Sequence, residues 1–351
     1  MKKRNSMIKY LLTALLIALL PSMDSPASSA SCGTLSAMYD PATYTTGTTL
    51  TDQSGCSNNG TIISGTPSKT TLPARFLLNQ GASGQYFYMN QSYNTPTTFS
   101  YAIWFRTSTA GGTKIMGFVQ STGNTETNYD RHIYIGTDGH LYYGIYDGSS
   151  VHTVSNSYSI ADGKWHFAAV TENSTSAKLY IDTQTPLSLS NTAQIFTGYW
   201  KVGGYKLTAW AGPGALGDGD WVGDVGKVYI YASTQITDTD VANLYASGKS
   251  SYILPSASVA LSSGSSATYR TLTNLQLNSG VDGKVTFYQA GKKIPGCQSL
   301  TTSGGSATCP WKPSIHNASN IYAKLIPIDT GFATITSPGI QVPIVKRSGQ
   351  R

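Results

Sequence analysis

The feature that most limits how this chain can fold is a period-two pattern of side chains in several short segments. In FSYAIWFRT (99–107), one face would carry Phe99, Tyr101, Ile103 and Phe105, and the other Ser100, Ala102, Trp104 and Arg106. Because successive side chains of a strand point to opposite faces, the pattern predicts a strand rather than a helix. The same pattern occurs in residues 113–120, 131–148, 165–172, 177–182 and 227–233.

The composition agrees with a fold built mainly of strands. The chain contains 36 glycines and 23 tyrosines, together with abundant threonine and serine. Tyrosine and threonine favour strands, and glycine and serine favour tight turns. Asp138-Gly139 lies between two alternating runs and predicts a hairpin turn. The sequence therefore predicts the all-β class.

A single short helix is expected near the middle of the chain, at residues 237–248. Thr237 or Asp238 would be its N-cap, Val241 and Leu244 lie at helical spacing, and Gly248 would end it. The following residues show no pattern up to Pro255. We therefore place a first domain at 31–248, a linker at 249–254 and a second domain at 255–347.

The second domain consists of short alternating runs separated by frequent turn signals. It includes ATYRTLTNLQL (267–277), GKVTFYQAGKKI (283–294) and NIYAKLIPI (320–328). Turn signals about every eight to twelve residues are typical of a small β-sandwich. Together with the first domain, this gives two β-sandwich domains in one chain.

The N-terminus has the pattern of a secretory signal peptide. Four basic residues precede an apolar run at 10–20, which is followed by small residues up to Ala30. The run is too short to span a bilayer, so we expect cleavage after Ala30. No later segment is long and apolar enough to span, and Cys32 lacks the preceding apolar residues of a lipoprotein signal. The mature protein should be secreted or held at the cell surface.

Four cysteines lie in the expected mature chain, and an exported protein most often pairs them. Cys297 and Cys309 lie on either side of the turn 303–306, which suits a cross-strand disulfide. Cys32 and Cys56 would then form a second, local disulfide worth about 3 kcal/mol.

The charge distribution argues against nucleic acid as a partner. The formal net charge is +7, but only 12% of the residues are charged, and part of the excess lies in the expected signal peptide. Beyond that peptide, basic residues are adjacent only at Lys292 and Lys293 and at Lys346 and Arg347. A surface that follows a phosphate backbone needs a basic stripe, and none is present.

Four segments of the first domain carry a family resemblance: GTTLTDQSGCSNNGTI (47–62), FSYAIWFRT, DGKWHFAAV with KLYID (162–182), and GDVGKVYIYASTQITDTDVANLYASG (223–248). They resemble the laminin-G-like, concanavalin A-like lectin jelly roll of exported bacterial proteins. The resemblance implies a jelly-roll sandwich. The chain departs from the family where an acidic pair is replaced by Gly226 and Lys227, and where a glycine is replaced by Thr183. Any metal or sugar site that needs the acidic pair is not implied here.

The second domain carries a shorter resemblance in GKVTFYQAGKKIPGCQSLTTSGGSATC (283–309). A Gly-x-Val-x-Phe strand, a cysteine, a glycine-containing turn and a second cysteine resemble bacterial immunoglobulin-like repeats. The resemblance implies an immunoglobulin-like sandwich that acts as a spacer or stalk.

Catalysis has little support in the sequence. Hydrolysis of a glycan needs two carboxylates across a groove, whereas the chain has only Glu126 and Glu172, far apart and outside any acidic cluster. Aspartates could replace them, so a glycan hydrolase stays a minor alternative. The stretch ADGKWHFAAVTE (161–172) resembles a small catalytic constellation, but strand alternation would point Trp165 and His166 in opposite directions. We interpret this stretch as structural, and no histidine pair or Gly-x-Ser-x-Gly elbow suggests other chemistry.

The candidate metal site is the segment LGDGDWVGDV, which holds Asp218, Asp220 and Asp224 beside glycines. Calcium takes six to eight oxygen ligands, and such a loop could supply several. The segment lacks the Asp-x-Asp-x-Asp-Gly spacing, so a solvated glycine-rich turn is the other interpretation.

The candidate ligand-binding residues are Trp210 and Tyr205, in a stretch rich in aromatic residues. Trp200 and Trp221 lie beside strands and are expected inside the sandwich, as large rings usually are. Trp210 lies in a glycine-rich loop without alternation, so we expect an exposed ring that could stack on a sugar.

The sequence thus predicts a secreted or cell-surface, non-catalytic binding protein. Its first domain would bind a glycan or a surface protein, with calcium as a candidate cofactor, and the second domain would be a spacer. The alternative is a structural or interaction component of the envelope, a matrix or an appendage that binds no sugar. Fold alone does not decide between them.

Overall fold

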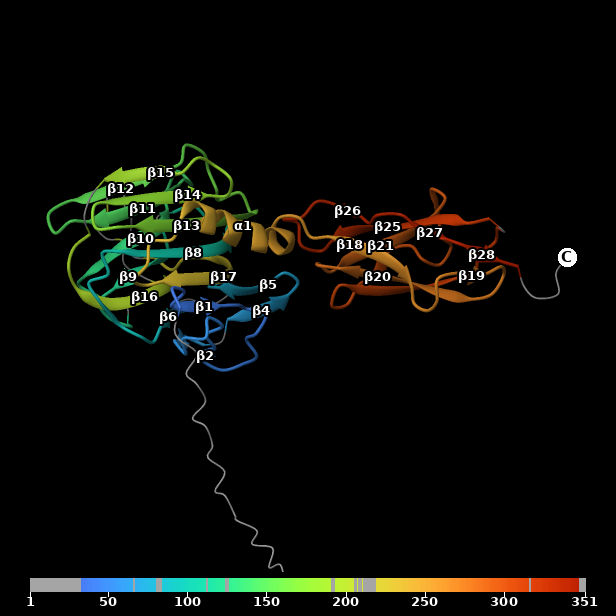
Figure 1. Ribbon diagram of the computed structural model, residues 1–351, viewed down its shortest axis with the longest axis horizontal. Coiled ribbons are helices and arrows are strands. Elements are labelled where there is room, and N and C mark those ends of the chain that lie inside the picture. Colours follow the sequence, from blue (N-terminus) through green and yellow to red (C-terminus); the bar gives the residue numbers. More distant parts are fainter. Residues whose placement is uncertain are drawn as a thin grey trace, which may run out of the picture.

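The computed structural model describes residues 33–65, 67–79, 84–111, 113–123, 126–190, 193–204, 207, 210, 219–315 and 317–346. They form two β-sandwiches, and the one helix among them, α1, lies between the two (Figure 1). The predicted all-β class is confirmed. Among these residues, no helix combines the length and apolar character needed to cross a membrane.

The first sandwich consists of two antiparallel sheets packed face to face. The eight-stranded sheet contains, in spatial order, β15 (Leu187–Ser190), β14 (Ser176–Ile181), β13 (Trp165–Glu172), β8 (Phe99–Arg106), β17 (Gly223–Tyr231), β5 (Ala74–Leu78) and β4 (Ser68–Thr71), with β1 (Ala37–Tyr39) paired to β17. The nine-stranded sheet contains β12 (Val151–Ser155), β11 (Leu141–Tyr146), β10 (Tyr129–Ile135), β9 (Thr113–Val119), β16 (Thr197–Gly203), β6 (Tyr86–Met89), β3 (Gly60–Ile63) and β2 (Thr49–Leu50), with β7 (Tyr93–Asn94) paired to β16. The predicted hairpin turn at Asp138-Gly139 connects β10 to β11.

The predicted alternation of β8 is confirmed, because its two faces belong to two different hydrophobic clusters. Phe99, Tyr101, Ile103 and Phe105 lie in the core between the two sheets. Ala102 and Trp104 lie on the outer face of the eight-stranded sheet, in a cluster that continues into the second sandwich. A sheet with apolar residues on both faces needs a cover on each side.

The helix α1 (Asp238–Tyr252) supplies part of that cover. Thr237 is its N-cap, and Thr237 and Asp240 form a capping box that satisfies the first backbone N–H groups. The Trp104 ring on β8 stacks against Tyr245 and Tyr252 of the helix, with centroids 5.4 and 4.9 Å apart. Packing against the sheet therefore holds the helix in place.

The expected helix end at Gly248 is wrong. The helix continues to Tyr252, four residues into the segment expected as the linker. A Cβ at position 248 would overlap the indole nitrogen of Trp104. Gly248 is thus a contact point between helix and sheet, because only a residue without a side chain lets the two approach this closely.

The two departures from the family pattern on β17 also have structural roles. A Cβ at Gly226 would lie 2.6 Å from the Tyr252 hydroxyl, so the glycine makes room for that ring. Lys227 forms an ion pair with Asp40, with 3.1 Å between Nζ and Oδ2. These positions serve packing and pairing.

The second sandwich also pairs its strands in an antiparallel manner, except for one short parallel pair. One sheet is β18 (Ala257–Leu261), β20 (Thr273–Ser279) and β24 (Ser306–Trp311). The other is β22 (Lys292–Lys293), β21 (Gly283–Gln289), β25 (Ser319–Pro327) and β26 (Ile335–Thr336), with β23 (Leu300–Thr301) on β21 and β27 (Ile340–Val342) on β25. The parallel pair is β19 (Ala267–Thr268) and β28 (Ile344–Val345).

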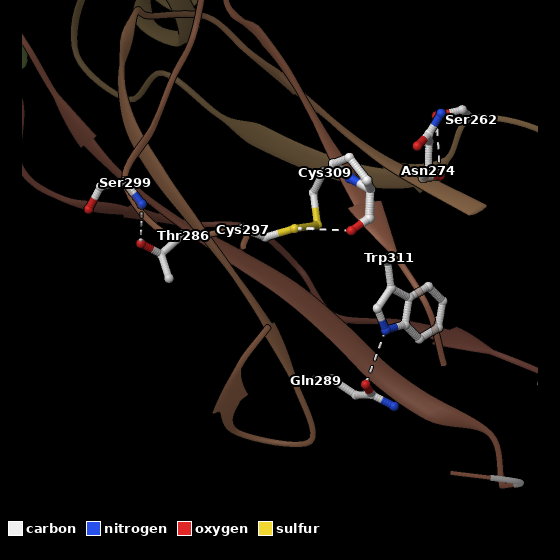
Figure 2. The surroundings of a disulfide bond; sticks show 9 residues. Ser262, Asn274, Thr286, Gln289, Cys297, Ser299, Cys309 and Trp311 are labelled. Atoms are coloured by element: carbon white, nitrogen blue, oxygen red, sulfur yellow. Dashed lines mark hydrogen bonds between the residues drawn. A yellow bond between two sulfur atoms is a disulfide. The ribbon is translucent and has the colours of Figure 1, made fainter. Parts of the chain in front are cut away.

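The predicted disulfide between Cys297 and Cys309 is present in the second sandwich (Figure 2). Cys309 is on β24, Cys297 is in the segment before β23, and both are buried. Nearby, the Trp311 indole N–H donates to the Gln289 side chain across 3.1 Å. Cys56 is disulfide-bonded as well, and its expected partner Cys32 lies outside the described residues. The expected signal peptide also lies outside them.

Candidate functional site

The stretch ADGKWHFAAVTE is part of the architecture, as the alternation predicted. Trp165 and Phe167 lie on the outer face of the eight-stranded sheet, and Ala168 and Val170 lie in the core between the sheets. His166 is held by two carboxylates, with Nδ1 2.8 Å from Asp182 and Nε2 3.2 Å from Asp162. Burial opposes the charged imidazole, but these two partners raise its pKa overall.

The two glutamates that a hydrolase would need are both buried and paired. The Glu126 carboxylate lies 2.6 Å from Lys201 Nζ, and both side chains are fully buried. Glu172 accepts a hydrogen bond from the Tyr143 hydroxyl inside the core, and burial raises its pKa to about 8. Neither carboxylate faces an open groove.

The predicted ligand-binding ring, Trp210, lies on the outer face of the nine-stranded sheet. There it packs with Tyr134, Tyr142 and Leu207 in a small cluster separate from the main core. Its ring is 4.7 Å from His132, and its side chain is only 6% exposed. The exposed ring expected at Trp210 is therefore wrong, and its role in ligand binding stays a prediction. Tyr205 lies outside the described residues.

The sequence makes room for this cluster with two glycines. A Cβ at Gly117 would overlap the His132 ring, and a Cβ at Gly144 would lie 2.5 Å from the Trp210 indole. His132 is fully buried, and burial lowers its pKa well below its usual value, with the charges of Lys114 and Arg131 adding to the effect. A neutral imidazole packed between rings suits a satellite hydrophobic cluster.

The other two tryptophans expected inside the sandwich are there. Trp200 and Trp221 are completely buried in the core between the sheets. Trp200 contacts Phe99 and Phe118, with ring centroids 4.9 and 5.0 Å apart. This part of the aromatic-rich stretch is confirmed as core.

Two of the predicted metal ligands, Asp220 and Asp224, have partners within the fold. Asp224 pairs with arginines, and Asp220 accepts a hydrogen bond from the Gly84 backbone N–H across 2.6 Å. Asp218 lies outside the described residues. Within the described ranges, no group of three or more His, Cys, Asp or Glu side chains is arranged to hold a metal ion. Calcium binding stays a prediction.

A cavity bordered by charged groups, here named the junction cavity, lies where the two sandwiches meet. Its volume is about 390 Å³, and its lining residues are Arg106, Thr107, Ser108, Thr109, Gly163, Val222, Gly223, Asp224, Asp329 and Thr330. Asp329 and Thr330 belong to the second sandwich. The remaining lining residues belong to the first, so the cavity depends on both.

Beside the junction cavity, two arginines and two aspartates alternate in one ion cluster, here named the junction cluster. Arg106 and Arg75 both contact Asp224 Oδ2, with Nη2 at 2.5 Å and Nε at 3.1 Å. Arg106 also pairs with Asp329, and Arg75 Nη2 lies 3.0 Å from the same residue. Although burial opposes it, Arg106 and Arg75 lower the pKa of Asp329. Asp329 therefore stays ionised and holds no proton for general-acid chemistry.

A second opening, here named the rim groove, lies where the edge strands of the two sheets of the first sandwich meet. Its volume is about 250 Å³. It is lined by Ser155, Asn156, Ser157 and Tyr158 after β12, by Leu179 and Ile181 of β14, and by Gln184, Thr185 and Leu187 around the β14–β15 turn. The sequence did not single it out, because its two walls are more than twenty residues apart in the chain.

The rim groove combines an apolar floor with polar walls and one exposed ring. Leu179 and Ile181 are buried beneath it, whereas the Tyr158 ring is 40% exposed. The Asn156 side chain is used in the fold, because it accepts from the Leu141 N–H at 2.7 Å and donates to the Tyr158 carbonyl at 2.5 Å. A lone aromatic residue between serines in a loop was the one signal that could have pointed to this site.

The comparisons with known proteins agree with the fold. The first sandwich is a concanavalin A-like jelly roll, and residues 79–242 match the family model described as the concanavalin A-like lectin/glucanases superfamily. No curated protein matches the sequence. The immunoglobulin-like nature of the second sandwich stays a prediction.

Several solved structures share parts of the fold at low sequence identity. Domain 4 of AbnA, a GH43 extracellular arabinanase from Geobacillus stearothermophilus in complex with arabinotriose, is 17% identical with a TM-score of 0.42, covering 60% of this chain and 98% of that one. The CBM40 of the Ruminococcus gnavus IT-sialidase, bound to alpha2,3 sialyllactose, is 17% identical with a TM-score of 0.32, covering 43% and 83%. A heptameric SAP-like pentraxin from Limulus polyphemus is 16% identical with a TM-score of 0.36, covering 49% and 80%.

Proposed function

We propose that this chain is a non-catalytic glycan-binding protein that acts outside the cytoplasm, with the jelly roll as the binding domain and the second sandwich as a spacer. The observation that carries the proposal is the rim groove, an open site with an apolar floor, an exposed ring and polar walls. Sugar rings present apolar C–H faces and many hydroxyls, so they match a site that offers both surfaces.

The positions of the carboxylates support binding without hydrolysis. Glycoside hydrolysis needs one protonated and one ionised carboxyl group on either side of the bond. Glu126 and Glu172 are buried and paired. At the junction cavity, Asp224 and Asp329 lie close together, but both are bound by arginines. These four groups therefore do not form an acid and base pair.

A glycan array with the purified protein tests the proposal. The protein should bind at least one class of glycan, with or without calcium, and should release no reducing ends when it is incubated with the glycan it binds. If it binds no sugar under either condition, the proposal is wrong and the structural or interaction role is favoured. Release of reducing ends would instead identify a hydrolase.

A further inference from the structure

The rim groove carries a more specific inference, which rests on the proposed function. We propose that it binds one neutral sugar unit, with the sugar's apolar face on Tyr158 and its hydroxyls at Gln184, Thr185 and Ser157. The unit would be part of a neutral oligosaccharide, and glycans whose unit here is a sialic or uronic acid would be bound poorly.

The size of the groove limits the occupant. Its volume of about 250 Å³ is smaller than the roughly 300 to 1,000 Å³ of pockets that enclose drug-sized ligands. The groove is partly open to solvent. A single ring with its neighbours continuing outside fits this shape better than an enclosed oligosaccharide.

The polar side chains at the groove are available to a ligand. Gln184, Thr185 and Ser157 are exposed, and within the described part of the chain their side chains make no hydrogen bonds. The amide of Gln184 can both donate and accept, as a sugar hydroxyl requires, and each hydroxyl can do the same. The site therefore offers three groups whose bonding is not already used by the fold.

The backbone that presents these groups is fixed. The Gln184 N–H donates to the Ile181 carbonyl at 3.0 Å and closes the turn after β14. In the same turn, Asp182 Oδ1 accepts from the Phe167 N–H at 2.8 Å. The opposite wall is held by Asn156, whose amide bonds the neighbouring hairpin strand and the Tyr158 carbonyl. A preorganised site loses less entropy when a ligand binds.

The charges around the groove favour a neutral ligand. The nine lining residues include no lysine, arginine, histidine, aspartate or glutamate. Asp182 lies next to the lining residue Ile181 in the chain, and it is paired with His166, whose other ring nitrogen faces Asp162. Together with burial, the charge of Asp182 raises the pKa of Tyr158, which shows that its field reaches the ring. An acidic sugar would therefore find no cation among the lining residues to pair with its carboxylate.

The experiment compares binding of neutral glycans and their sialylated or uronic-acid counterparts by the full chain and its variants. The strongest neutral hit on the array is titrated calorimetrically. We expect Tyr158→Ala to weaken binding about tenfold or more, the loss of about 1.4 kcal/mol of contact. Gln184→Ala should weaken it several-fold, and Tyr158→Phe should retain most of the affinity, because it keeps the ring.

Two further variants distinguish a failure of the groove assignment from a failure of the proposed function. One is a matched control, and the other should gain binding of acidic glycans. Tyr322→Ala removes a partly exposed ring from the second sandwich and should leave binding unchanged. Gln184→Lys places a cation at the groove and should allow acidic glycans to bind. If the native chain binds glycans but Tyr158→Ala binds equally well, or if acidic glycans are preferred, the groove assignment is overturned while the proposed function stands. If the native chain binds none, both fail.

Discussion

The junction cavity and the rim groove are both open to solvent, but they differ in how charge is used. The junction cavity is bordered by Arg106, Asp224 and Asp329, whose charges are already satisfied by each other across the two sandwiches. The rim groove has no charged lining residue, and three of its polar groups make no bonds to the described chain. Groups already committed to the fold stabilise it, whereas uncommitted groups are available to a ligand.

This difference distinguishes residues that stabilise the fold from residues that are available to bind a ligand. Three residues that look reactive in the sequence, Glu126, Glu172 and Asp224, lie in buried pairs or in the ion cluster beside the junction cavity. The residues of the rim groove are ordinary serine, threonine, glutamine and tyrosine. Removing a committed charge should therefore destabilise the fold, and removing an uncommitted group should not.

The largest effect is expected from Asp224→Ala. Asp224 is 2% exposed and bridges two arginines, so its loss leaves buried guanidinium groups without a counter-charge. Breaking such a pair costs about 3 to 5 kcal/mol of unfolding free energy, measured here by urea denaturation. Lys164→Ala is the surface control, because its side chain is 70% exposed and its ion pair with Asp162 is local. An Asp224→Ala variant as stable as the control would show that the junction cluster contributes little.

A smaller effect on the free energy of unfolding is expected from the buried carboxyl group of Glu172 as the pH changes. Burial raises its pKa to about 8, above its ordinary value of 4.5, so the folded state holds this proton more tightly than the unfolded state. Its contribution to stability is full below about pH 4.5 and is lost as the pH rises through 8. Glu172→Gln should remove this decline, on the order of 1 to 3 kcal/mol, in unfolding curves measured from pH 5 to 9. Identical pH profiles for the two proteins would contradict it.

The stability of the protein at acid pH tests how much the ion pairs of Asp329 contribute to the fold. Its pKa is lowered by Arg106 and Arg75 against the effect of burial, so the folded state binds this proton less tightly than the unfolded state. Its contribution is present above pH 4 and is lost as the pH falls further. Asp329→Asn should cost about 1 to 2 kcal/mol at neutral pH and lose part of the acid-dependent change. Thermal melts from pH 2.5 to 7 measure the stability at neutral pH and its change with acid. If Asp329→Asn lost stability with acid as much as the native protein does, Asp329 would not have this role.

The smallest effect on stability is expected at the rim groove. Tyr158 is 40% exposed, so Tyr158→Ala should change the free energy of unfolding by no more than about 0.5 kcal/mol, the usual range for surface substitutions. Because the groove lacks charge, glycan affinity should also change little between 50 and 500 mM salt. Thermal melts and calorimetric titrations check the two statements. If Tyr158→Ala strongly lowered the stability, Tyr158 would be a structural residue like those of the ion cluster. The difference between the rim groove and the junction cavity would then not hold.

Much of the fold could be predicted from local patterns. The alternation in 99–107 placed its residues on the two faces of β8, and the capping residue Thr237 placed the start of α1. The positions of Cys297 and Cys309 on either side of one turn predicted the disulfide that the structure contains. Each of these features depends on residues close together in the chain, where side-chain direction and turn geometry follow from spacing alone.

The errors occurred where residues distant in sequence meet. Gly248 has the local character of a helix end, but it lies inside the helix because Trp104 packs there. Trp210 has the local character of an exposed loop ring, but it is buried against His132 and Tyr134. In both cases a tertiary contact overrides the local preference.

The sequence by itself determined the all-β class, the two-sandwich organisation and the faces of the main strand. Only the tertiary structure decided which polar groups are committed and which are available. It paired Arg106 with Asp329 and Glu172 with Tyr143, and it brought the residues after β12 beside the β14–β15 turn to form the rim groove. The physical reason is that periodicity depends on neighbours in the chain, whereas burial, ion pairing and grooves depend on neighbours in space.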